Sequence, residues 1–265
     1  NKQNRKYIMK ILTIGDIVGG ISIDYLGKNL SRAVRENKID FVIANAENAS
    51  EIKGLSRNDA EAIFNLGVDF ITLGNHAFGK RDLYDYLDNN DHKIIRPANF
   101  PTASPGSGYG IASVDGFKLL IINVLGTMYM NPLNSPFEAV ERILEREKGR
   151  YDFAILDIHA EATSEKLALA HYFDGKIAII LGTHTHVQTA DEKILPKGSA
   201  YITDIGMTGP VNSILGTKIE TIINKFTKQL PQYFTVADGI VQANGVIFEL
   251  DTNTNKPISI TRIQF

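Results

Sequence analysis

Short apolar runs rich in β-branched residues alternate with helical patterns along most of this chain, and this alternation constrains the fold more than any other feature. The runs lie at residues 10–14, 41–44, 70–73, 93–95, 153–157 and 177–181. Their length and composition are typical of buried strands. Between them, apolar residues recur every three or four positions, as they do in the stretch 25–37. Repeated alternation of strand and helix predicts an α/β fold built on largely parallel strands.

The last third of the chain is richer in strand patterns than the rest. Helices are predicted at 25–37, 57–66, 80–89, 136–148 and 164–173, and further strands at 109–114, 117–124, 193–195, 199–203, 240–250 and 257–263. Asp115–Gly116 joins two of these strands as a hairpin turn, and one helix-like stretch lies at 218–228. We therefore predict an α/β fold of two sheets packed face to face with helices outside, a four-layer α/β/β/α sandwich.

No repeat, low-complexity tract or linker divides the 265 residues, so we predict a single domain over 1–265. The polar, basic residues 1–9 lack the apolar core of a secretion signal, and they are either a natural extension or the remnant of a tag. No apolar run is long enough to span a membrane, and a cytoplasmic location is the default expectation.

Composition limits the chemistry that is available. The chain has no cysteine, which excludes disulfides and thiolate metal sites and leaves His, Asp, Glu and Asn as metal ligands. A net charge of -2 gives no general reason to expect a long nucleic acid as partner.

Metal-competent side chains follow the ends of several predicted strands. In chain order they are Asp16, Glu47, Asn48, Asn75, His76, His159, His184 and His186. In α/β sheets, ligands bind outside the carboxyl ends of the strands, so these side chains are expected at one rim. They are too many for one tetrahedral zinc ion. They suit two metal ions bridged by a carboxylate, an arrangement that clamps both oxygens of an in-line phosphoryl displacement.

Each of these residues also has an ordinary interpretation when it is taken alone. Asp16 is a plausible helix cap, Glu47 and Asn48 suit a turn, and His159 suits a hydrogen-bonded position in the core. It is their placement at successive strand ends that favours a shared site. The two remaining histidines, His92 and His171, are predicted to be ordinary surface or helix residues.

Several segments carry a family resemblance. They are Gly15–Gly19, Ala46–Ala49, Leu73–His76, Asp157–Glu161, Gly182–Asp191 and Thr203–Pro210, in this order. With them the chain resembles the YmdB-like branch of the calcineurin-like metallophosphoesterases, over residues 10–265. Val18 stands where the wider superfamily has a histidine ligand, and Asn48 is the replacement ligand in this branch.

The resemblance implies a role for each residue. Asp16, Asn48 and His186 would hold one metal ion, Asn75, His159 and His184 the other, and Glu47 would bridge them. His76 would be the proton donor to the leaving oxygen, and a hydroxide between the metals would be the attacking species. The implied cofactors are two divalent or mixed-valence ions, with Fe or Mn expected and Zn or Mg as alternatives. The implied substrate is a small phosphodiester such as a 2′,3′-cyclic nucleotide, RNA ends that carry one included.

Two other functions remain open from the sequence. An amidohydrolase also uses His-x-His and two metals, but usually near the start of a barrel, whereas here the motif comes late. The second is a metal-organised nucleotide-binding regulatory protein with little turnover. It is kept because residues 20–23 and 126–127 lack arginines that relatives tend to carry, and Lys80 and Arg81 are the candidates to compensate. The oligomeric state is left open, with a homo-oligomer among the alternatives.

Overall fold

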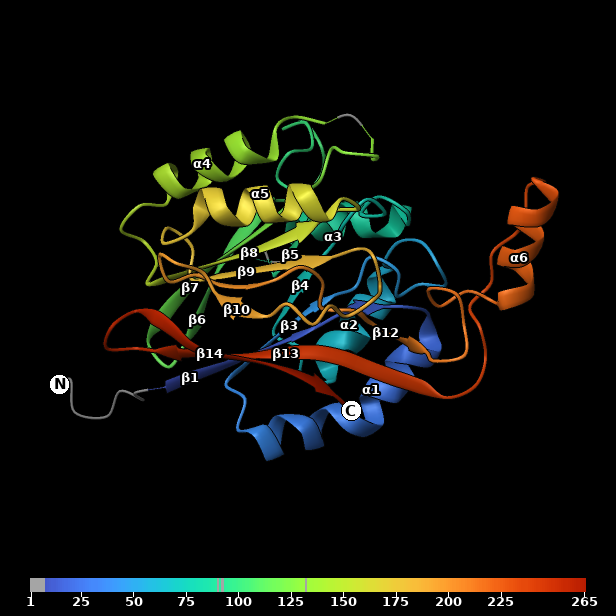
Figure 1. Ribbon diagram of the computed structural model, residues 1–265, viewed down its shortest axis with the longest axis horizontal. Helices are drawn as coiled ribbons and strands as arrows, with labels where there is room; N and C mark the ends of the chain where they lie inside the picture. The colour runs from blue at the N-terminus through green and yellow to red at the C-terminus, as the bar shows by residue number, and fades with distance from the viewer. Residues whose placement is uncertain (1–7, 90, 92, 132) are drawn as a thin grey trace.

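Two mixed β-sheets lie face to face in the computed structural model, which describes residues 8–89, 91, 93–131 and 133–265 (Figure 1). The first sheet contains, in spatial order, β2 (Asp16–Ile17), β12 (Met207–Pro210), β13 (Val241–Asp251), β1 (Ile8–Ile14), β3 (Phe41–Asn45), β4 (Phe70–Thr72) and β5 (Ile94–Ile95), with β14 (Lys256–Gln264) also paired to β13. The second contains β10 (Lys193–Ile194), β11 (Ala200–Ile202), β9 (Ile179–Thr183), β8 (Phe153–His159), β7 (Phe117–Leu125) and β6 (Tyr109–Val114).

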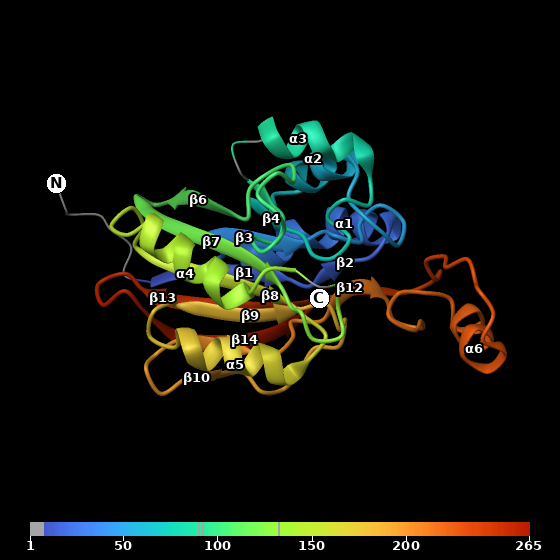
Figure 2. The ribbon, with the colours of Figure 1, turned by 90° about the horizontal axis from the view of Figure 1, so that it is seen from above.

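Helices cover the outer face of each sheet. On the first sheet lie α1 (Gly20–Asn37), α2 (Arg57–Asn65) and α3 (Tyr84–Asn89), the last preceded by the short 3₁₀ helix η1 (Arg81–Leu83). On the second lie α4 (Pro136–Arg146) and α5 (Thr163–Phe173), as Figure 2 shows. Ser56 and Ser135 cap α2 and α4 by accepting from backbone N–H groups in their first turns.

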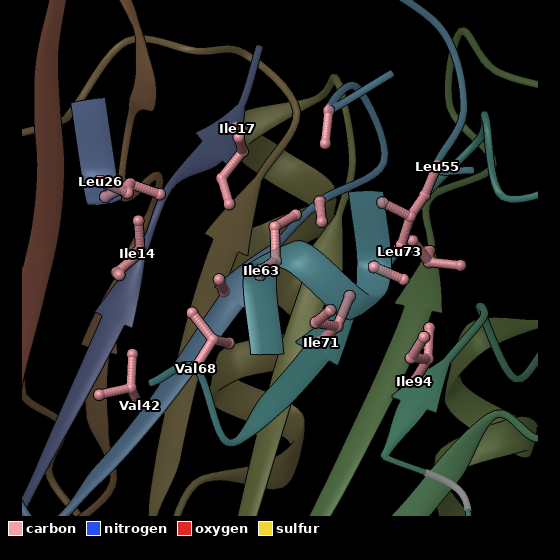
Figure 3. Packing of buried hydrophobic residues seen from close by; sticks show 14 of the residues in the cluster. Ile14, Ile17, Leu26, Val42, Leu55, Ile63, Val68, Ile71, Leu73 and Ile94 are labelled. Atoms are coloured by element: carbon pink, nitrogen blue, oxygen red, sulfur yellow. The ribbon is translucent and has the colours of Figure 1, made fainter. Parts of the chain in front are cut away.

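Three apolar layers hold the four structural layers together. Successive residues of a strand point to opposite faces, so Ile11 enters the layer between the sheets and Leu12 the layer under the helices. Figure 3 shows the latter layer, in which Ile14 and Ile71 of the strands lie near Ile63 of α2. The third layer lies between the second sheet and α4 and α5. The predicted four-layer α/β/β/α sandwich is confirmed.

Some predicted boundaries were wrong. Helix α1 begins at Gly20, five residues before the predicted start, because its first turn lacks the apolar periodicity seen from Tyr25 onward. The strands β2 and β12 were missed, since they are short and glycine or proline residues lie in or beside them. Gly182 does not end its strand. It lies within β9, where a Cβ atom would collide with the Thr203 carbonyl oxygen.

The helix α6 (Ile219–Lys228) stands away from the rest of the structure in both Figure 1 and Figure 2. None of its residues is buried, and Ile223 and Phe226 are exposed. Within the described part of the chain, no helix has the length and apolar character that crossing a bilayer requires. His171 is exposed on α5, as predicted, while His92 lies outside the described residues.

Candidate metal centre

The predicted ligands come together at one edge of the paired sheets. Strands β1, β3 and β4 run parallel, and so do β8 and β9, so that within each set the carboxyl ends lie at the same edge. Asp16, Glu47 and Asn75 follow the first set, whereas His159 and His184 belong to the second. The site therefore draws residues from both sheets.

His159 lies at the centre of the first group of contacts. Its Nε2 atom is 3.0 Å from Asn75 Oδ1, 3.1 Å from Glu47 Oε1 and 3.1 Å from His184 Nδ1. One ligand atom from each of Glu47, His159 and His184 lies within 4.8 Å of the others. These distances place oxygen and nitrogen donors around one point, as a metal ion requires.

The second group contains Asp16, Asn48 and His186. His186 Nε2 lies 3.3 Å from Asn48 Nδ2 and 3.9 Å from Asp16 Oδ1. The Asn48 oxygen faces His76 at 2.8 Å from Nδ1, so the amide must turn for that oxygen to act as a ligand beside His186. Asp16 Oδ1 is buried and has no hydrogen-bond partner among the described residues. An unpartnered buried carboxylate oxygen is costly, and a cation would satisfy it.

Glu47 links the two groups. Its Oε1 accepts from Asn48 Nδ2 at 3.1 Å and lies equally close to His159 Nε2, while Oε2 accepts from the His76 backbone N–H at 2.8 Å. Burial opposes ionisation of this side chain, but His159 and His76 outweigh it and hold the pKa of Glu47 well below its usual range. A buried, ionised carboxylate between two sets of donors is suited to bridging two cations.

The electrostatics of the cluster also favour a cation. Burial raises the pKa of Asp16 to about 6, although His186 and His159 oppose the rise. Burial and the neighbouring His159 lower the pKa of His184 to about 3, so its imidazole is neutral, the form that binds metals. Burial would lower the pKa of His159, but Glu47 and Asp16 raise it to about 9. The carboxylates thus attract positive charge to this cluster. Its oxygen and nitrogen ligand atoms suit divalent metal ions.

His76 lies at the rim of the cluster. Its side chain is 27% exposed, and its Nδ1 atom is 3.3 Å from Glu47 Oε1. The adjacent Asn75 turns the other way, toward His159. The two side chains therefore point in different directions, and His76 is accessible to a substrate.

A chain of buried hydrogen bonds orients His159. Its Nδ1 lies 2.8 Å from the Thr183 hydroxyl, which donates to Asp157 Oδ1 at 2.7 Å. Thr72 donates to the other Asp157 oxygen at 2.5 Å. The Thr183 hydroxyl therefore accepts from Nδ1–H and leaves Nε2 directed at the cluster, as outer hydrogen bonds do in metal sites.

A buried ion pair makes hydrogen bonds to the loop that carries His184 and His186. Lys166 Nζ donates to Asp204 Oδ2 and to the Thr183 carbonyl, each at 2.8 Å. Asp204 Oδ2 also accepts from the Thr185 backbone N–H and hydroxyl. Both histidines have positive φ angles, 94° and 65°, which non-glycine residues adopt only where their surroundings impose them.

Lys166 and Asp204 were not among the predicted site residues. The sequence does contain a signal that Lys166 is buried and paired. Lys166, Leu169, Ala170 and Phe173 form one buried stripe of α5 at helical spacing, with a lysine on the apolar face. A charged residue in such a place is almost never buried unless it is paired.

Replacing Lys166 with methionine is expected to lower the free energy of unfolding by about 3–5 kcal/mol, because the Asp204 charge would stay buried without its partner. Chemical denaturation measures this change. Lys28→Met on the exposed surface of α1 is the matched control. The double variant Lys166→Met, Asp204→Asn should recover part of the loss, and a double variant that loses the sum of both single effects would contradict the pairing.

Comparison with known proteins finds a matching family model and a similar protein. Residues 12–263 match the family model described as YmdB-like protein. The chain is 44% identical over 255 residues to the 2′,3′-cyclic-nucleotide 2′-phosphodiesterase of Bacillus subtilis (strain 168), covering 96% of both chains.

Two solved structures are similar along their whole length. One is a hypothetical protein from Thermus thermophilus, with a TM-score of 0.91, 40% identity, and coverage of 97% of this chain and 99% of that one. The other is a phosphatase from Mycoplasma pneumoniae, with a TM-score of 0.92, 37% identity, and coverage of 99% and 94%. The resemblance found in the motifs is confirmed, and the chain belongs to the YmdB-like family.

Proposed function

We propose that this protein is a dinuclear metal-dependent phosphodiesterase that hydrolyses small phosphodiesters such as 2′,3′-cyclic nucleotides, RNA ends that carry this group included. The observation that carries the proposal is the convergence of six metal-competent side chains around a seventh, the buried Glu47 carboxylate. The 44% identity to a relative named as a 2′,3′-cyclic-nucleotide phosphodiesterase supports the choice of substrate.

The residues divide into two ligand sets in this proposal. Asn75, His159 and His184 would hold one ion, Asp16, Asn48 and His186 would hold the other, and Glu47 would contribute to both sites. When bound, the ions would supply Lewis acidity toward the phosphate oxygens and would lower the pKa of water. Fe or Mn best suits this mixture of imidazole, carboxylate and amide donors, and Zn or Mg are the alternatives.

His76 is the proton donor in this proposal. Its side chain is 27% exposed at the rim of the cluster, where a leaving oxygen can approach it. Hydrolysis forms a bond between phosphorus and a water oxygen and breaks the bond between phosphorus and the ribose oxygen. The ribose oxygen takes a proton from the His76 imidazolium as it leaves, and the proton lost by the water passes to solvent. A positioned general acid of this kind contributes about 10²–10⁴-fold to the rate.

One observation favours a second function, a metal-organised nucleotide-binding regulatory protein with little turnover. The position after Gly126, where relatives tend to carry an arginine, is Thr127, and its N–H and hydroxyl both donate to Glu165. This position therefore offers no guanidinium to a phosphate. Slow turnover together with tight nucleotide binding would support this function over the first.

Removal of metal tests the leading proposal. Protein treated with a chelator and desalted is expected to lose hydrolysis of 2′,3′-cyclic AMP, and Mn²⁺ or Fe²⁺ should restore it. Metal content by mass spectrometry and nucleotide product by chromatography are measured on the same samples. Full hydrolysis by protein without measurable metal would overturn the proposal.

A further inference from the structure

A cleft of about 630 Å³ lies beside the candidate metal centre and has no part in the roles given so far. We call it the side cleft, and its lining includes Glu51, Lys53, Gly79, Lys80, Tyr233 and Phe234. Its volume is in the range of sites that take small organic ligands. Its position and its lining decide which ligand it suits.

One wall of the side cleft is formed by the two loops that leave the metal centre. Glu51 lies three residues after Asn48, and Gly79 lies three residues after His76. The loops are in contact, since a Cβ atom on Gly54 would come 2.8 Å from the Gly79 carbonyl carbon. This wall is therefore built from the two chain segments that directly follow Asn48 and His76.

The opposite wall of the side cleft, residues 232–236, contacts the segment that lies beside His186. Val236 pairs with Thr217, and the Ala237 N–H donates to the Gly216 carbonyl at 2.8 Å. The neighbouring Leu215 carbonyl lies 3.1 Å from His186 Nδ1. The side cleft thus opens between the Asn48 and His76 loops and the segment next to His186.

The lining combines aromatic rings with cations. Lys225 Nζ lies 4.7 Å from the centre of the Phe234 ring, a cation–π contact that orients the ring. The Tyr233 side chain is 84% exposed and belongs to the lining, so its ring is accessible to a ligand. Lys80 pairs with Glu51 at 3.2 Å, whereas Lys53, the other lysine of the lining, has no ion-pair partner among the residues that the structure describes.

We propose that the side cleft binds the nucleobase of the nucleotide whose phosphate lies at the metal centre, with Phe234 as the stacking surface and Tyr233 beside it. This rests on the proposed phosphodiesterase function and adds to it the part of the enzyme that recognises the base. Stacking of a base on an aromatic side chain contributes about 1–3 kcal/mol by alanine substitution, which corresponds to about 5–150-fold in affinity.

Adenosine, which has no phosphate, tests the side cleft without any catalysis. Calorimetry on the metal-loaded protein should detect adenosine binding, and Phe234→Ala should weaken it at least fivefold. Phe226→Ala, an exposed aromatic residue of α6 outside the lining, is the matched control and should bind like the wild type. Equal binding by Phe234→Ala and the wild type, or no binding by the wild type, would overturn the assignment whether or not the protein is a phosphodiesterase.

Kinetic measurements then distinguish an effect of Phe234 on base recognition from an effect on the metal centre. Glycerol 1,2-cyclic phosphate has the same five-membered ring as a 2′,3′-cyclic nucleotide but no base. Phe234→Ala should lower kcat/KM for 2′,3′-cyclic AMP at least fivefold and leave that for glycerol cyclic phosphate unchanged. An equal fall for both substrates would mean that Phe234 supports the metal centre and not the base, and would overturn the inference. If the wild type cleaves neither substrate, the proposed function fails and the adenosine result still decides the side cleft.

A short RNA that ends in a 2′,3′-cyclic phosphate distinguishes the two sources of the same terminal nucleotide. If the side cleft holds the terminal base, Phe234→Ala should slow cleavage of the RNA end and of the mononucleotide by a similar factor. A loss confined to the RNA would place an internal base in the side cleft and would contradict the inference.

Discussion

Replacing His76 with alanine is expected to lower kcat for a 2′,3′-cyclic nucleotide about 10²–10⁴-fold while the metal content stays at the wild-type value. The side chain lies at the rim of the cluster, and its closest contacts are the Asn48 oxygen and the Glu47 carboxylate. Both of these residues keep other contacts within the cluster when His76 is removed. The loss should therefore fall on proton transfer to the leaving oxygen and not on metal binding.

Two controls make this result specific. His171→Ala removes an exposed histidine of α5 and should leave kcat unchanged. A substrate whose leaving group needs no proton, such as a nitrophenyl ester, should lose much less activity in the His76→Ala variant than a cyclic nucleotide does. Loss of metal from the His76→Ala variant would instead identify His76 as a ligand and would remove the proton-donor role.

The Glu47→Gln substitution is expected to have the larger effect, with loss of metal and of detectable turnover together. It preserves the shape of the side chain but removes the charge that lies between the two ligand groups. An amide is a weak substitute for a carboxylate that contacts two cations, because it carries no charge and only one oxygen. The remaining buried imidazoles and Asp16 cannot supply the same charge.

Metal analysis and the cyclic nucleotide assay check this result on one preparation. Glu145→Gln, on the exposed surface of α4, is the matched control and should keep both metal and activity. Circular dichroism should show that the Glu47→Gln protein is folded, since the substitution preserves the shape of the side chain and leaves the three apolar layers unchanged. A Glu47→Gln variant that holds two ions with wild-type affinity would contradict the bridging role.

The layers and the eight polar residues at the strand ends were predictable because both follow from local patterns, whereas the assignment of seven of them as ligands was implied by the family resemblance. Apolar alternation located most strands, and the polar residues that end a strand can be named from the sequence without any knowledge of how the sheets pack. Parallel strands then bring Asp16, Glu47 and Asn75 to one edge of the first sheet. The same reasoning brings His159 and His184 to one edge of the second.

The parts that could not be predicted depend on contacts between distant segments. The partner of Lys166 is Asp204, 38 positions away, and periodicity gives no information about that pairing. The strand β12 contains Gly209 and Pro210 and forms only because β2 and β13 flank it. The side cleft likewise needs residues 232–236 to lie against loops that come far earlier in the chain.

The distribution of the ligands over both sheets has a consequence for the order of maturation. Asp16 and His184 are 168 positions apart, and His159 and His184 come from a sheet whose strands follow most of the first sheet in the chain. During synthesis, Asp16, Glu47, Asn48 and Asn75 emerge before the histidine ligands do. The complete site exists only after the two sheets have packed on each other. In the proposed enzyme, an ion held by Asn75 from the first sheet and by His159 and His184 from the second would also link the two sheets.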